Sequence, residues 1–182
     1  VAFWISLAAL VMMIGGRSLL LAAWFPVLHL GLMIPPPYWT ITLTSWQFQL
    51  WSSELGVWMI RLFDIPVLLM GNIIDLGDTK LEVAQACSGL AYLFPFFSIA
   101  LIAAYFYKGP FWQRAIIFLA SIPITVVLNS LRIAVIGVLS AYGNDALTDG
   151  FLHFFEGWVV FLLCILIFLG FMYVLSHLTG QS

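Results

Sequence analysis

Long runs of apolar residues, separated by short polar segments, dominate this chain. The runs cover residues 18–34, 90–107, 115–142 and 157–175, and an incomplete one covers residues 1–14. A helix that crosses a membrane needs about 20 consecutive apolar residues, so the runs predict membrane spans, the first of them truncated at its N-terminal end. The pattern is typical of an all-α polytopic membrane protein, a helical bundle with one transmembrane domain over residues 1–182.

Residues 35–89 depart from this pattern. Pro35-Pro36-Pro37 ends the second span, because three prolines cannot continue a helix. Large apolar residues then recur at helical spacing among glutamines and serines: Phe48, Trp51, Leu55, Trp58 and Leu62. This spacing predicts an amphipathic helix that lies in the membrane interface, with its tryptophans at headgroup depth. Two short β-prone runs around Gly77-Asp78 predict a β-hairpin after it.

Composition and charge support the membrane class and assign the two sides of the membrane. The chain is 64% hydrophobic and 8% charged, whereas about a quarter of a soluble domain is charged. No basic run is interleaved with aromatic residues, which excludes nucleic acid as a partner. Cytoplasmic loops carry the excess of Lys and Arg, so Arg17 and the loop from Lys108 to Arg114 are assigned to the inside. Residues 35–89, the predicted hairpin among them, then lie outside.

Three residues whose side chains can take part in a reaction are expected at one depth in the membrane. Cys87 lies 21 positions before Lys108, which is about 30 Å of helix. Arg132 lies 18 positions after Arg114, about 27 Å, and so reaches the same outer boundary. His153 precedes the last span. A thiol, a guanidinium and an imidazole are therefore predicted near the outer surface on three different segments.

The two cysteines favour different interpretations. Cys164 lies inside an apolar run, where a free cysteine is a small buried hydrophobe. Cys87 is flanked by Gln85, Ser88 and Gly89 at a depth that water reaches. A thiol reacts as its thiolate, and a nearby cation lowers the pKa of the thiol. Cys87 is therefore the candidate nucleophile, and Ser88 is a weaker alternative that lacks a G-x-S-x-G turn.

Arg132 and His153 each have a structural and a chemical interpretation. An arginine near a helix end can extend toward lipid headgroups, but apolar residues continue after Arg132, which favours a polar cavity. Asn129 lies on the same helix face and can support it. Glu156, three residues after His153, can orient the imidazole or be a solvated surface residue. No metal-ligand spacing and no cofactor motif is present in the sequence, so neither is expected.

Three segments together resemble the exosortase/archaeosortase family: "LEVAQACSGL", "IPITVVLNSLRI" and "HFFEGW". The resemblance implies a transpeptidase-like enzyme at the outer face of the bacterial cytoplasmic (inner) membrane. It implies that Cys87, Arg132 and His153 are catalytic. From their positions beside these three, Asn129, Ser88 and Glu156 are expected to be substrate-binding or supporting residues. The chain departs from the family pattern at Ala91, where an arginine often follows the "CSGL" motif.

The resemblance also implies the substrate class and the partners. These are secreted proteins with a C-terminal sorting signal, which combines a motif such as Pro-Glu-Pro, a transmembrane helix and a basic tail, and an acceptor on a lipid or envelope polymer. In the hypothesis, Cys87 forms a thioester, His153 transfers protons, and Arg132 stabilises the oxyanion or the thiolate. The alternative is a non-enzymatic transporter or assembly scaffold in which Arg132 lines a polar cavity.

Overall fold

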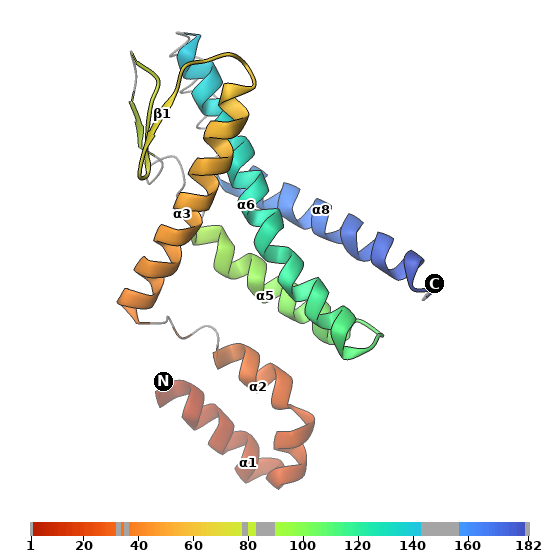
Figure 1. Cartoon of the computed structure of the whole chain (residues 1–182). Helices are drawn as coiled ribbons and strands as arrows, with labels where there is room; N and C mark the ends of the chain where they lie inside the picture. The colour runs from red at the N-terminus through yellow and green to blue at the C-terminus, as the bar shows by residue number, and fades with distance from the viewer. Residues whose placement is uncertain are drawn as a thin grey trace. The chain divides into compact units, whose positions relative to one another are not determined.

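The computed structural model describes residues 2–31, 34, 37–77, 80–82, 90–142 and 157–180. The described helices are α1 (Ala2–Ala22), α2 (Trp24–Gly31), α3 (Tyr38–Arg61), α5 (Leu90–Phe106), α6 (Phe111–Ala141) and α8 (Gly157–Leu178), with three short strands (Figure 1). The predicted all-α membrane class with a small β element is confirmed. The chain divides into two compact units, residues 1–42 and 43–182, which are described separately.

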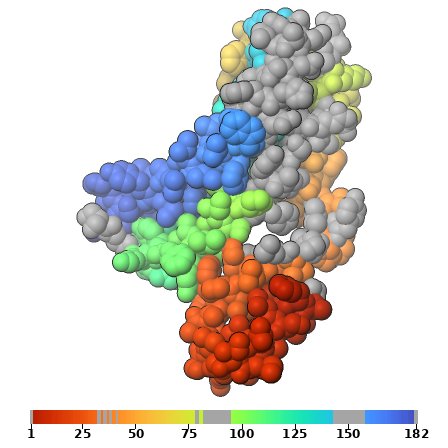
Figure 2. All heavy atoms as spheres, turned by 180° about the vertical axis from the view of Figure 1, so that it is seen from behind, coloured from red at the N-terminus to blue at the C-terminus, as the bar shows by residue number. Residues whose placement is uncertain are grey.

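Three described helices are long and apolar enough to cross a membrane: Ala2–Ala22, Phe111–Ala141 and Trp158–Leu178. The outer surface of α8 carries large apolar side chains, among them Leu162, Leu166 and Leu169, each about half exposed. Figure 2 shows α8 along one open face of the molecule. Water disfavours such a surface and lipid does not, so this is the surface of a membrane protein.

In the unit of residues 1–42, the chain reverses and packs on itself. Gly16 adopts a left-handed φ of 64° with ψ of −164°, a conformation that glycine takes without the steric penalty of a Cβ atom. This kink lies between the predicted first and second spans. The indole Nε1 of Trp4 donates a hydrogen bond to the carbonyl of Val27, which fastens α2 to α1.

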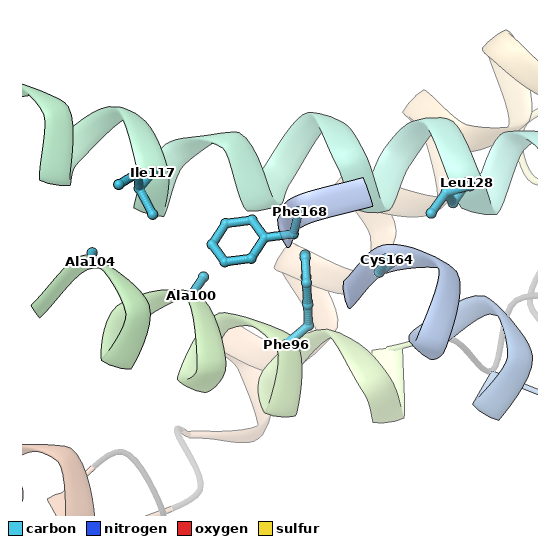
Figure 3. Close-up of a cluster of buried hydrophobic side chains, with 7 residues drawn as sticks. All are labelled: Phe96, Ala100, Ala104, Ile117, Leu128, Cys164 and Phe168. Atoms are coloured by element: carbon cyan, nitrogen blue, oxygen red, sulfur yellow. The ribbon is translucent and has the colours of Figure 1, made fainter. Parts of the chain in front are cut away.

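In the unit of residues 43–182, α5, α6 and α8 share an apolar core. Its buried members are Phe96, Ala100, Ala104, Ile117, Leu128, Cys164 and Phe168. The rings of Phe96 and Phe168 meet edge to face, with centroids 5.5 Å apart and an angle of 78° between the planes. Figure 3 shows that α5 and α8 both run opposite to α6 through this core. The first residues of α5 and α8 therefore lie toward the end of the shared core from which the C-terminal half of α6 continues.

Helix α3 packs against α6 through its small and polar face. Ser52, Ser53 and Gly56 are buried, while Trp51 and Trp58 on the other faces are about half exposed. A Cβ atom built on Gly56 would lie 2.9 Å from Cγ2 of Ile133 and 3.3 Å from the carbonyl of Ser130. Small residues permit this close approach between membrane helices.

A second glycine contact fixes the relative direction of the two helices. A Cβ atom on Gly137 of α6 would lie 2.6 Å from Cδ1 of Ile60 on α3. Gly56 precedes Ile60 by one turn, just as Ile133 precedes Gly137. Therefore α3 and α6 run in the same direction where they touch (Figure 1).

A three-stranded antiparallel sheet follows α3. It contains β1 (Leu68–Met70), β2 (Ile73–Asp75) and β3 (Lys80–Glu82), in the order β1-β2-β3. The predicted hairpin at Gly77-Asp78 is confirmed as β2 and β3, with Asp75 paired to Lys80 in register, and their side chains form an ion pair of 3.5 Å. The prediction missed β1, whose three residues are too short for a periodic pattern.

The sheet rests on the C-terminal half of α6. Ile74 of β2 is fully buried in a cluster with Val57, Ile60, Ile133 and Ala134. Leu81 of β3 packs against the same cluster. The last strand before Cys87 therefore lies against the α6 residues that directly follow Arg132.

The glycine contact between α3 and α6 predicts a difference between two glycine substitutions. Gly56→Leu forces a side chain into Ile133 and the Ser130 carbonyl, and overpacking of this kind costs about 1–3 kcal/mol. Gly170 in α8 has open space where its Cβ atom would stand, so Gly170→Leu is the matched control. We expect the thermal unfolding midpoint in detergent to fall for Gly56→Leu only. Equal midpoints for the two variants would contradict the close contact.

Candidate functional site

Arg132 lies in the C-terminal half of α6 with its side chain inside the protein. The residue is only 6% exposed, whereas its neighbour Leu131 is 47% exposed and faces outward. An arginine that extends along a lipid-facing surface would show the opposite pattern. The Nε atom of Arg132 is buried and has no hydrogen-bond partner among the described residues. A buried N–H group without a hydrogen-bond partner destabilises the folded protein, so the Arg132 guanidinium is a candidate to bind a further group.

Three hydroxyl groups of α6 are satisfied within the helix. The hydroxyls of Ser121, Thr125 and Ser130 each donate to a backbone carbonyl three or four residues earlier, at 2.6–2.8 Å. Such local bonds are the usual solution for Ser and Thr in a helix. Asn129 is half-buried and lies about 60° around the helix from Arg132. Asn129 and Arg132 thus place two polar side chains about one turn apart in the C-terminal half of α6.

Arg132 lies toward the end of the bundle where α5 and α8 begin. Leu128, four residues before Arg132, belongs to the core shared with Phe96 of α5 and Cys164 of α8. From that core, Arg132 is about 6 Å further along α6. Leu90 is about 9 Å from Phe96 along α5, and Gly157 is about 10 Å from Cys164 along α8, in the same direction. The beginnings of both helices are therefore near the level of Arg132.

Four of the predicted site residues lie outside the described part of the chain. Cys87 and Ser88 fall between β3 and α5, and His153 and Glu156 fall directly before α8. The structure describes Arg132 and Asn129 and brings together the elements that flank the other four. Among the described residues, no group of three or more His, Cys, Asp or Glu side chains is placed to hold a metal ion.

The model of the family described as Transmembrane exosortase (Exosortase_EpsH) matches residues 1–170. The chain belongs to the transmembrane exosortase family. The matched range contains all three segments on which the resemblance was based, so the predicted family is confirmed. No curated protein and no solved structure matches the chain.

Cys164 of this exosortase is a core residue, as predicted. It is 4% exposed and lies in the apolar cluster with Phe96, Leu128 and Phe168 (Figure 3). A thiol in such surroundings is structural rather than reactive. Cys87, outside the described residues, stays the predicted nucleophile.

Sequence reasoning missed Ser52 of α3. It was assigned to the polar side of an interfacial helix, yet it is 1% exposed, and its hydroxyl has no hydrogen-bond partner among the described residues. The available signal was the pair Ser52 and Gly56, one turn apart, because small residues at this spacing mark a face that packs against another membrane helix.

The burial of Cys164 predicts selective thiol labelling of this exosortase in native membranes. A Cys87→Ala chain, which retains only Cys164, should resist a water-soluble maleimide until detergent denatures it. A Cys164→Ala chain, which retains only Cys87, should react before denaturation. Mass spectrometry of the intact protein measures both. Prompt labelling of Cys164 would contradict its position in the core.

Proposed function

We propose that this exosortase is a membrane-embedded cysteine transpeptidase. It cleaves the C-terminal sorting signal of secreted proteins and transfers them to an acceptor on a lipid or envelope polymer. The observation that carries the proposal is Arg132, a buried guanidinium with an unpartnered Nε atom at the end of the bundle where α5 and α8 begin. A preorganised cation inside an apolar protein is suited to stabilise negative charge that develops during a reaction.

The length of the chain limits how far Cys87 and His153 can be from the end of the bundle where α5 and α8 begin. Cys87 is three residues before Leu90 and five after Glu82, and an extended chain covers at most about 3.6 Å per residue. Its Cα atom is therefore within about 11 Å of the Cα atom of Leu90. His153 is four residues before Gly157, hence within about 14 Å of the start of α8. Both limits are compatible with a site built around Arg132.

In the proposed reaction, the Cys87 thiolate attacks the carbonyl carbon of the scissile peptide bond. The developing oxyanion accepts hydrogen bonds from Arg132, or Arg132 keeps Cys87 ionised before the attack. The C–N bond then breaks, His153 gives its proton to the leaving amine, and a thioester remains on Cys87. The acceptor nucleophile attacks the thioester and gives its proton to His153, which restores the thiolate.

Each supporting residue is given a role from its position in the sequence relative to the three catalytic candidates. Asn129, next to Arg132 on α6, holds the guanidinium or contacts the substrate. Glu156 orients the imidazole of His153 and fixes which nitrogen carries the proton. Ser88, next to the nucleophile, contributes a polar group beside the thioester. A site enclosed by α5, α6 and α8 also limits water, which would otherwise compete with the acceptor.

The proposal includes the location and the substrate. The site faces the outside of the bacterial inner membrane, where secreted proteins arrive. The substrate carries a Pro-Glu-Pro-type motif, a transmembrane helix and a basic tail. The apolar helix of the signal holds the scissile bond at the outer boundary of the membrane and converts the encounter into a nearly intramolecular reaction.

The proposal predicts the activities of three single variants. Cys87→Ala should leave all substrate uncleaved, because no thioester forms. Arg132→Met should lower the rate of cleavage by about 10²–10³, the usual effect of removing one oxyanion donor. Cys164→Ala is the matched control and should cleave normally. The measurement is the fraction of substrate that retains its C-terminal tail, and mass spectrometry should detect a thioester at Cys87 of the active chain.

The same set of variants separates the enzyme from a transporter or scaffold. A non-enzymatic protein in which Arg132 lines a cavity would keep its cellular function with Cys87→Ala and lose it with Arg132→Met. Cleavage that survives Cys87→Ala would contradict the proposed mechanism.

A further inference from the structure

Ser52 has an unusual hydrogen-bond state for a helical serine. Its hydroxyl oxygen is buried and has no partner among the described residues. The next residue, Ser53, is equally buried, but its hydroxyl donates to the carbonyl of Gln49 at 2.6 Å. The hydroxyl of Ser53 thus bonds to the preceding turn of its own helix, and the hydroxyl of Ser52 does not. An unpartnered buried hydroxyl is unfavourable, and a ligand with a donor or acceptor at this position would remove that cost.

Ser52 lies on the face of α3 that meets α6. It precedes Gly56 by one turn, and Gly56 contacts Ile133 and the Ser130 carbonyl. The two helices run in the same direction there. Ser52, one turn before Gly56 on α3, therefore lies near the level of Asn129, one turn before Ile133 on α6.

Asn129 connects the α3 side of α6 with Arg132. Around the helix, Asn129 is about 40° from Ile133 and about 60° from Arg132, in opposite directions. The half-buried Asn129 therefore lies between the line that faces α3 and the guanidinium. Ser52, Asn129 and Arg132 thus lie near one level of two neighbouring helices, and Ser52 and Arg132 each have a buried polar atom without a hydrogen-bond partner among the described residues.

A substrate whose scissile bond is held inside the protein needs hydrogen-bond partners of this kind. The prolines of a Pro-Glu-Pro motif cannot continue the helix of the signal, so the N–H and C=O groups beside the scissile bond have no helical partners. Such groups are tolerated within a membrane only where the protein satisfies them. A hydroxyl, which donates and accepts, together with an amide and a guanidinium, meets both requirements.

From this arrangement we infer that Ser52 is a substrate-binding residue that hydrogen-bonds the backbone of the sorting signal next to the cleaved bond. The inference rests on the proposed function and extends its site to α3.

The test measures binding separately from cleavage. The probe is a fluorescent peptide with a Pro-Glu-Pro motif, an apolar helix and a basic tail, added to the full chain in lipid nanodiscs. All proteins carry Cys87→Ala, so that the probe is not consumed, and the added substitutions are Ser52→Ala or Ser53→Ala. We expect Ser52→Ala to raise the Kd about three- to tenfold, the effect of one lost hydrogen bond. Ser53→Ala, the matched control, should leave the Kd unchanged.

Thermal unfolding distinguishes a binding role from a structural one. Removal of an unpartnered hydroxyl should leave the midpoint of the Ser52→Ala chain unchanged or higher while binding weakens. Equal Kd values for the Ser52→Ala and Ser53→Ala chains would overturn the inference, as would a fall in midpoint that matches the loss of binding. A parent chain that binds no probe would overturn the proposed substrate class together with the role of Ser52. Cleavage by the Cys87→Ala parent would overturn only the mechanism.

Discussion

The burial of the Arg132 guanidinium is the constraint on which the account of this exosortase depends. A charge inside a membrane protein is costly unless it faces a polar cavity or partners, and α6 does not satisfy Nε from its own residues. The fold positions Arg132 just beyond the apolar core of α5, α6 and α8, where those helices meet the segments that contain Cys87 and His153. The apolar core thus supports a buried cation whose Nε atom has no partner among the described residues.

The second structural theme is the inverted polarity of α3. In a water-soluble protein the serines of this helix would face solvent and its tryptophans the core. Here Ser52 and Ser53 are buried, and Trp51 and Trp58 are exposed, because lipid accepts the large side chains and the neighbouring helix accepts the small ones. The same face that permits close contact with α6 supplies a hydroxyl near Asn129. Packing and proposed substrate binding therefore use adjacent residues of one helix.

The sequence predicted what depends on local pattern and failed where tertiary contacts decide. The runs of apolar residues were sufficient to predict the membrane class and the all-α fold. The β-prone runs around Gly77-Asp78 were sufficient to predict the hairpin. The burial of Cys164 also followed from its neighbours in the chain. The spacing of the large apolar residues did not predict the burial of Ser52, because that spacing defines two faces of α3 and does not say which one meets α6. The small-residue pair Ser52 and Gly56 marks that face. The position of Arg132 relative to the starts of α5 and α8 likewise depends on antiparallel packing in three dimensions.

Proximity of Cys87 to residue 132 is the most direct test of the account. An Arg132→Cys chain that also carries Cys164→Ala contains two cysteines, which a short bifunctional thiol crosslinker can join in native membranes. The control chain carries Leu131→Cys instead, at the outward-facing position next to it. The account predicts a crosslink between residues 87 and 132, identified by mass spectrometry of the digested protein, and little or none between residues 87 and 131. No crosslink to residue 132, or equal yields at both positions, would contradict a shared site for the thiol and the guanidinium.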